Sequence, residues 1–156
     1  MKFIYLFICF LAIASTSFAQ KTKTVEIVKR VNYKEYIDAI YILNNENKTK
    51  AINIRFACQN YEYQHISDLI TLYYGSPSGF YKFLNEIEVF YKENEPGVSQ
   101  TIQGHDVEIK KGGKASVWIY EKRADGDGYY KLSMKSLAKF KTEFVDWCKK
   151  NNVAYE

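Results

Sequence analysis

The residues of this chain that could carry out catalysis are few, and the most suggestive are a histidine and an aspartate three positions apart. His65 and Asp68 lie in a segment whose composition predicts a loop, and three serines are close in the sequence: Ser67, Ser76 and Ser78. A histidine oriented by a carboxylate can act as a general base toward a serine hydroxyl, as in many hydrolases. The motif Gly-x-Ser-x-Gly does not occur, so His65 and Asp68 are weak catalytic candidates, with a solvated loop as the alternative.

The remaining polar motifs do not indicate a metal or phosphate site. His105 and Asp106 are adjacent on an expected strand, where neighbouring side chains point to opposite faces. The sequence Asp-Gly-Asp-Gly at 125–128 lacks the other ligands of a calcium loop and suits a tight turn. Lys-Lys-Gly-Gly-Lys at 110–114 lacks the spacing of a phosphate-binding loop. We therefore expect no metal and no cofactor, and a non-enzymatic protein is favoured over an enzyme.

The first 19 residues have the pattern of a cleaved signal peptide. Lys2 supplies a positive start, and residues 3–14 form an apolar run too short to span a bilayer as a helix. Ser17 and Ala19 are the small residues that precede a cleavage point, and the segment resembles the signal peptides of bacterial exported proteins. We expect cleavage after Ala19 and a secreted or periplasmic mature chain, with an uncleaved anchor as the alternative. No later segment predicts a transmembrane helix.

The expected mature chain, 20–156, has the size of a single domain and a mild positive charge. The full sequence has a formal net charge of +4, and removal of Lys2 takes away one positive charge. Charges of both signs are interleaved, so the composition argues against a nucleic-acid-binding surface. The partner that we expect is an unidentified protein, peptide or glycan.

Hydrophobic periodicity predicts an α+β fold. Two amphipathic helices are expected at 76–94 and 133–152, because Ser76 and Ser133 are good N-caps and Pro77 suits a first helical position. Turns of hairpin length favour antiparallel pairing. We therefore expect one largely antiparallel sheet of six to seven strands with both helices on one face. The expected strand segments, in which apolar and polar residues tend to alternate, are 22–31, 35–45, 51–58, 68–74, 99–110, 114–122 and 129–132.

The two helical segments resemble each other at an offset of 57 residues. Ser76 then aligns with Ser133, and Phe83 aligns with Phe140, together with several lysines and most apolar positions. This agreement predicts an internal duplication of a strand–helix unit, with pseudo-repeat halves 20–95 and 96–156 within one domain. Independent amphipathic patterning of two helices is the alternative explanation of the apolar matches.

Two cysteines, Cys58 and Cys148, remain outside the expected signal peptide. Cys58 has the apolar parity of its expected strand, and Cys148 lies on the apolar face of the last expected helix. Both side chains should therefore point into one core. A disulfide between them is one reading, since exported proteins can keep disulfides, and two buried free thiols are the other.

Several tyrosines are not explained by the expected core faces of the helices. Tyrosine suits contact surfaces, because it combines a large apolar ring with a polar tip, although partial burial at sheet edges is the alternative. We therefore predict an exported binding or interaction module. A small exported hydrolase using His65 and Asp68, and a structural component of a cell-envelope assembly, are the alternatives. The candidate binding residues are Tyr61, Tyr63, Tyr73, Tyr74, Tyr81, Tyr129 and Tyr130.

Overall fold

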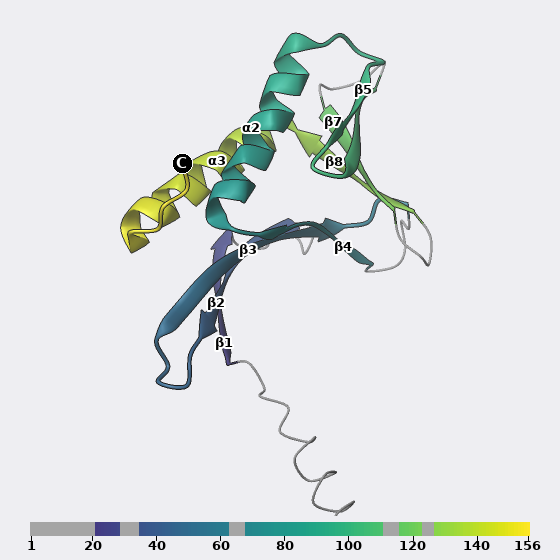
Figure 1. The fold of residues 1–156 in the computed structure, drawn as a ribbon. Helices are drawn as coiled ribbons and strands as arrows, with labels where there is room; N and C mark the ends of the chain where they lie inside the picture. Colours follow the sequence, from purple (N-terminus) through teal and green to yellow (C-terminus); the bar gives the residue numbers. More distant parts are fainter. Residues whose placement is uncertain (1–20, 29–34, 63–67, 111–115, 123–126) are drawn as a thin grey trace, which may run out of the picture.

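The described part of the chain folds into two four-stranded antiparallel sheets and two helices (Figure 1). The structure is a computed structural model and describes residues 21–28, 35–62, 68–110, 116–122 and 127–156. The first half contains β1 (Thr22–Val28), β2 (Glu35–Leu43), β3 (Thr49–Gln59), β4 (Leu69–Gly75) and α2 (Pro77–Glu93). The second half contains β5 (Ser99–Ile102), β6 (His105–Ile109), β7 (Ser116–Glu121), β8 (Gly128–Ser133) and α3 (Met134–Asn151).

Strand order in both sheets follows chain order, β1-β2-β3-β4 and β5-β6-β7-β8. The α+β class and the antiparallel pairing are confirmed, but the expectation of six to seven strands in one sheet is wrong. The additional strand arises because 99–110 is a hairpin that turns at Gln103 and Gly104. These two residues have φ values of 47° and 90°, as a type I′ hairpin turn requires.

Both helices begin after the serines that the sequence predicts as N-caps. Ser76 Oγ accepts a hydrogen bond from the backbone N–H of Gly79 at 3.1 Å, and Ser133 Oγ accepts one from Ser136 at 3.0 Å. Each bond satisfies one of the backbone donors that the first helical turn leaves without an intrahelical partner. At the other end of α3, Asn152 has the left-handed conformation typical of a helix C-terminus, with φ 54°.

A single hydrophobic core joins the sheets and the helices, and Phe56 of β3 lies near its centre. Its fully buried ring meets Phe80 of α2, Phe140 of α3 and Tyr130 of β8 edge-on, with ring centroids 6.2, 5.4 and 6.0 Å away. In Figure 1, α2 and α3 lie together on one side of the first sheet. The helix positions buried in this core are Phe80, Phe83, Leu84, Ile87 and Phe90 of α2 and Leu137, Phe140, Phe144 and Cys148 of α3.

A buried asparagine after β3 ties the two halves together. Asn60 is fully buried, and its Oδ1 accepts a hydrogen bond from the backbone N–H of Tyr129 at 3.1 Å. Its Nδ2 donates to Asp68 Oδ2 at 3.0 Å, and the next residue, Tyr61, donates its N–H to the Tyr129 carbonyl at 2.9 Å. Gly128 is needed beside this junction, since a Cβ there would lie 2.7 Å from Asn60 Nδ2. The end of β3 is thereby fixed to the start of β8.

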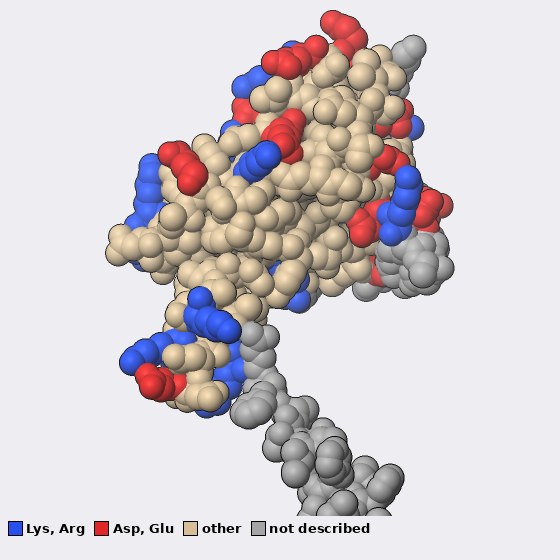
Figure 2. All heavy atoms as spheres, viewed as in Figure 1, with Lys and Arg blue, Asp and Glu red and all other residues tan. Residues whose placement is uncertain are grey.

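The charged side chains are distributed unevenly over the face shown in Figure 2. Lysines gather on the hairpin of β2 and β3, where Lys48 lies in the turn and Lys50 at the start of β3. Over α2 and α3 much of this face is uncharged. Within the residues that the structure describes, neither helix has the length and hydropathy that a membrane-spanning helix needs.

Candidate functional site

The candidate site is a cluster of aromatic and lysine side chains on the solvent side of the second sheet, which we call the aromatic face. Alternation along β7 points Val117 and Ile119 into the core and leaves Trp118 and Tyr120 on the opposite side. In β8 the same alternation places Tyr129 on the solvent side. The aromatic face consists of Tyr61, Trp118, Tyr120, Tyr129, Lys110 and Lys131.

The rings of the aromatic face pack against one another across the strands. Trp118 and Tyr129 are stacked with 4° between their planes and 4.7 Å between centroids. Tyr120 lies opposite Tyr129 in the strand register, and their centroids are 6.1 Å apart. Tyr61, which comes from the first half of the chain, stacks on Tyr129 at 6.3 Å. Each aromatic pair of this kind adds about 1 kcal/mol to the stability of the fold, in addition to the effect of the buried surface area. The rings of the cluster therefore hold one another in a fixed arrangement.

Two lysines cover the rings from the solvent side. Lys131 Nζ lies 4.3 Å from the centroid of Trp118 and 5.8 Å from those of Tyr61 and Tyr129. Lys110 Nζ lies 5.2 Å from the Trp118 ring. An ammonium over a ring is attracted by the negative ring face, by about 0.5–1 kcal/mol at an exposed site. The lysines are therefore held in place by the rings and still carry positive charge to the surface.

Glu108 neutralises one of these two lysines. Its carboxylate lies 2.7 Å from Lys110 Nζ and accepts a hydrogen bond from the Tyr120 hydroxyl at 3.0 Å. The bond from Lys110 lowers the pKa of Glu108, and the same bond raises the pKa of Lys110. Both groups are therefore charged at neutral pH. Lys131 has no carboxylate partner among the described residues, so it is the uncompensated charge of the aromatic face.

A hollow of about 520 Å³ adjoins the aromatic face at Tyr120. Its walls carry Lys122, whose Nζ lies 2.8 Å from Asp106, and Thr101, which donates to the same carboxylate at 3.1 Å. These bonds, first that from Lys122, lower the pKa of Asp106. The hollow offers both charged donors and charged acceptors next to an aromatic ring. Its lining residues are Ser99, Gln100, Thr101, Asp106, Val107, Glu108, Tyr120, Lys122 and Asp127.

The predicted tyrosines do not form one patch, and only Tyr61 and Tyr129 lie together on the aromatic face. Tyr130 is 1% exposed and donates its hydroxyl to Glu35, so it belongs to the core. Tyr73 packs on Phe80 and Phe83 and donates to the Ser76 carbonyl at 3.0 Å. The remaining described tyrosines lie elsewhere: Tyr74 is 57% exposed on the first sheet, and Tyr81 packs on Tyr155. Tyr63 lies outside the described residues.

The described residues do not bring Asp68 to a serine of α2. Asp68 accepts hydrogen bonds from the side chain and the backbone of Asn60, at 3.0 and 2.9 Å. It precedes β4, whereas Ser76 and Ser78 follow it, and a strand of this length separates its ends by roughly 20 Å. A triad with either serine would need contact distances. His65 and Ser67 lie outside the described residues.

His105 and Asp106 point to opposite sides of the second sheet, as their adjacent positions predict. His105 packs its ring on Phe83 of α2, with centroids 5.9 Å apart, and its Nδ1 lies 2.8 Å from Glu121. Asp106 is held on the solvent side by Lys122. No group of three or more metal-ligating side chains occurs among the residues described.

The two cysteines are buried and free in the structure, and they lie far apart. Cys58 is opposite Glu35 at one end of β2, whereas Cys148 lies near Tyr41 of the same strand. The strand from 35 to 41 spans about 20 Å. Bridged cysteines have Cα atoms within about 7 Å of each other. The structure therefore has the arrangement of two free thiols and does not form the bridge.

We expect both thiols of the folded chain, without residues 1–19, to resist a thiol reagent at neutral pH. Burial raises the pKa of Cys58 well above its ordinary value and the pKa of Cys148 to about 11, so the reactive thiolate is scarce. Thiol titration before and after denaturation, without reductant, measures this. The expected result is no rapid reaction in the folded state and two reacting thiols after unfolding. Fewer than two after unfolding would contradict the free pair.

Trp118 and Tyr120 are site residues that the sequence reasoning missed. Apolar residues occur at both parities of the segment 114–122, which predicts a central strand. The structure confirms that β7 is central, between β6 and β8, but one face of it is open to solvent. The sequence does contain a signal for a solvent-facing side of this strand. Aliphatic Val117 and Ile119 alternate with Trp118 and Tyr120, whose rings each carry a polar atom.

The fold and this face define a small α+β protein with two antiparallel sheets, one of which carries an aromatic and lysine-bearing outer surface. Comparison with known proteins finds no family model, no curated protein and no solved structure that matches the chain.

Proposed function

We propose that this protein is an exported binding module and that the aromatic face is its contact surface for a protein or peptide partner. The observation that carries the proposal is the stack of Trp118 and Tyr129 under Lys131 on the solvent side of the second sheet. Tryptophan and tyrosine dominate the binding energy of many protein interfaces. Export is part of the proposal and rests on the signal-peptide pattern of residues 1–19.

A protein or peptide fits this surface better than a sugar ring does. A sugar stacks on the open face of an aromatic ring, but Trp118 has Tyr129 on it at 4.7 Å and Lys131 over it at 4.3 Å. A carboxylate of a polypeptide partner can instead pair with Lys131 while its apolar side chains cover the ring edges. Mixed apolar and charged contact of this kind is typical of protein interfaces.

The test compares Trp118→Ala with Tyr74→Ala, which removes an exposed ring from the other sheet. Proteins of the exported fraction of the source cells are captured on immobilised parent and variants, and the affinity of each captured protein is then measured in solution. For the true partner, Trp118→Ala is expected to weaken binding at least tenfold, as truncation of a central interface residue does. Tyr74→Ala should change the affinity less than twofold.

Lys131→Ala gives a second, independent measurement of the same proposal. Loss of its exposed charge is expected to weaken binding severalfold and to reduce the dependence of the affinity on salt. Equal affinities for the parent, Trp118→Ala and Lys131→Ala would contradict the proposal. Binding of soluble glycans that depends on Trp118 would contradict the choice of a polypeptide partner.

The alternative functions have less support from the described residues. A hydrolase with Asp68 and a serine of α2 is disfavoured by their placement at opposite ends of β4. A structural role in a cell-envelope assembly needs an exposed edge or patch that another subunit covers, and it differs from the binding module only in the permanence of the contact.

We also infer that the halves 20–95 and 96–156 arose by duplication. Each half has a four-stranded antiparallel sheet in chain order, followed by a helix that begins after a capping serine, Ser76 or Ser133. This shared order supports the repeat that the offset of 57 residues indicates in the sequence.

A further inference from the structure

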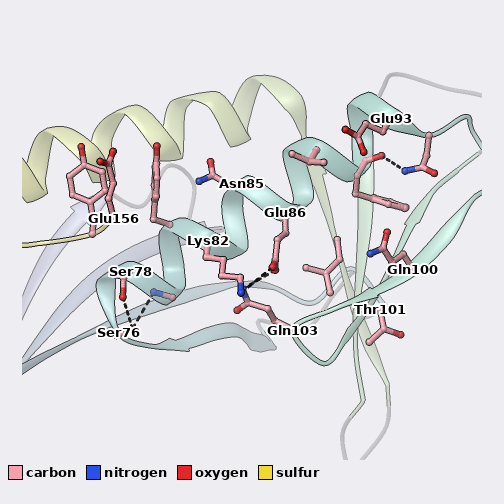
Figure 3. Close-up of a pocket in the computed structure, with 17 residues that line it drawn as sticks. Ser76, Ser78, Lys82, Asn85, Glu86, Glu93, Gln100, Thr101, Gln103 and Glu156 are labelled. Atoms are coloured by element: carbon pink, nitrogen blue, oxygen red, sulfur yellow. Dashed lines mark hydrogen bonds and ion pairs between the residues drawn. The ribbon is translucent and has the colours of Figure 1, made fainter.

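A second cavity, the α2–β5 groove, lies away from the rings of the aromatic face. It has a volume of about 870 Å³ and runs along α2, with β5 as its other wall and Tyr155 and Glu156 beside it (Figure 3). Its lining on α2 extends from the capping serine to the end of the helix. A helix of this length measures about 25 Å, so the groove is long enough for seven or eight extended residues.

The strand that borders the groove has an open edge. Among the described strands, β5 pairs with β6 only. The two-residue turn makes Ile102 and His105 a hydrogen-bonded pair, and such pairs alternate along the two strands. The backbone N–H and C=O groups of Thr101 and Ser99 therefore point away from β6. These groups are the donors and acceptors that an added strand uses.

β5 lacks the usual protection of an edge strand. Its four residues, Ser-Gln-Thr-Ile, include neither lysine nor proline, whereas the edge strand β1 carries Lys23. Gln100 and Thr101 line both the α2–β5 groove and the hollow on the outer side of the sheet. The open edge of β5 is therefore accessible from both sides.

The floor of the groove is apolar and its rim is acidic. Val89 of α2 is 49% exposed, and Tyr81 packs on Tyr155 with centroids 5.0 Å apart. The rim carries Glu86, Glu93 and Glu156 against one lysine, Lys82, whose Nζ lies 3.8 Å from Glu86 (Figure 3). The hollow beyond β5 adds Asp106, Glu108 and Asp127 against Lys122 and against Lys110, which pairs with Glu108. Carboxylates therefore outnumber lysines on both sides of the open edge.

We propose that the α2–β5 groove binds an extended, basic peptide segment of a partner protein, which pairs as an added strand with β5. The backbone groups at Ser99 and Thr101 give the pairing, and the apolar floor at Val89 and Tyr81 receives alternate side chains. Lysine or arginine side chains of the segment meet Glu93 and the other rim carboxylates. This site is separate from the rings at Trp118, so it does not depend on the function proposed above.

The proposal is tested with a peptide of about eight residues that alternates lysine and valine, with blocked ends. Controls are the peptide in which glutamate replaces lysine, and the Tyr74→Ala variant, which removes an exposed ring outside the groove and should bind the basic peptide as the parent does. Calorimetry is expected to show binding of the lysine peptide and at least tenfold weaker binding of the glutamate peptide, because the rim is acidic.

Amide hydrogen exchange distinguishes strand addition from general electrostatic binding. The lysine peptide is expected to slow the exchange of the Ser99 and Thr101 amides at least tenfold. The amides of Gln100 and Ile102 should change little, because they are already paired with β6. Protection spread over other acidic surfaces, with no change at Ser99 and Thr101, would overturn the proposal.

Two matched substitutions test the backbone contact and the charge. Thr101→Pro removes the outward N–H at a position where an edge strand tolerates proline, and Thr101→Val keeps it. The proline variant is expected to lose at least tenfold in affinity and the valine variant less than twofold.

The charge of the groove is tested by Glu93→Lys, which should also weaken peptide binding. The control Glu143→Lys changes a glutamate of α3 outside the groove and should not weaken it. Self-association that Thr101→Pro abolishes, without peptide binding, would overturn the proposal in favour of a second copy.

Discussion

Replacement of Phe56 with alanine is expected to lower the free energy of unfolding by about 4 kcal/mol, within the range for phenylalanine truncation in a core. The ring is fully buried and meets rings from both helices and from β8, at centroid distances of 5.4 to 6.2 Å. Its loss removes buried apolar contacts and leaves a cavity where β3, β8 and the two helices meet. These four elements cannot all move inward to fill it. Urea unfolding followed by circular dichroism measures the change.

The matched control for this substitution is Tyr74→Ala, which removes a ring that is 57% exposed. We expect it to cost less than about 1 kcal/mol, as substitutions at exposed positions generally do. A cost below about 1 kcal/mol for Phe56→Ala would contradict the central position of Phe56. A change in the slope of the urea transition would instead indicate that the halves unfold separately.

Replacement of Asn60 with alanine is expected to cost about 3 kcal/mol. The side chain is fully buried and accepts hydrogen bonds from the N–H groups of Glu62 and Tyr129, at 3.0 and 3.1 Å, while it donates to Asp68. Truncation leaves the two N–H groups without their acceptor, and each buried unpaired group costs about 1–3 kcal/mol. The same urea experiment gives the magnitude, and the near-ultraviolet signal reports whether Tyr61 and Tyr129 stay packed.

Asn60→Asp separates the two roles of this side chain. The variant keeps an acceptor for the N–H groups but replaces the donor to Asp68 with a second carboxylate. The nearby negative charge raises the pKa of the introduced carboxyl in the folded state, so the charged form is destabilising. The deficit relative to the parent should therefore be largest near pH 7 and shrink as the pH falls and a proton is taken up. A deficit independent of pH between 7 and 5 would contradict this role of Asn60.

The helices of this fold were predictable from sequence because their signals are local. Ser76, Ser133 and Pro77 mark helix starts through bonds and φ restrictions within one turn, and the apolar faces that follow them are buried. The hairpin at Gln103 and Gly104 escaped prediction, because glutamine is not a typical residue for positive φ. The division into two sheets depends on which strand edges stay apart, and alternation of apolar residues does not encode that choice.

The candidate site was predictable in part. Tyr61 and Tyr129 were both candidates, but their contact depends on the bond from the Tyr61 N–H to the Tyr129 carbonyl, which joins residues 68 positions apart in the chain. Trp118 was not a candidate, because an aromatic residue on a strand with apolar residues on both faces is predicted to lie in the hydrophobic core. The groove along α2 was also beyond sequence reasoning, since its other wall belongs to the second sheet.

The order of the strands in each sheet has a consequence for how the chain acquires its structure. Every strand pairs with a neighbour in sequence, so each sheet can form from a contiguous segment of chain with short loop closures. The first sheet can therefore assemble while the second half is still being synthesised. Phe56 and Asn60 find their partners in β8 and α3 only when the last residues arrive. Until then only α2 covers the apolar side of the first sheet, and the part that α3 and β8 later bury stays exposed. This interval is when the protein is most prone to aggregate.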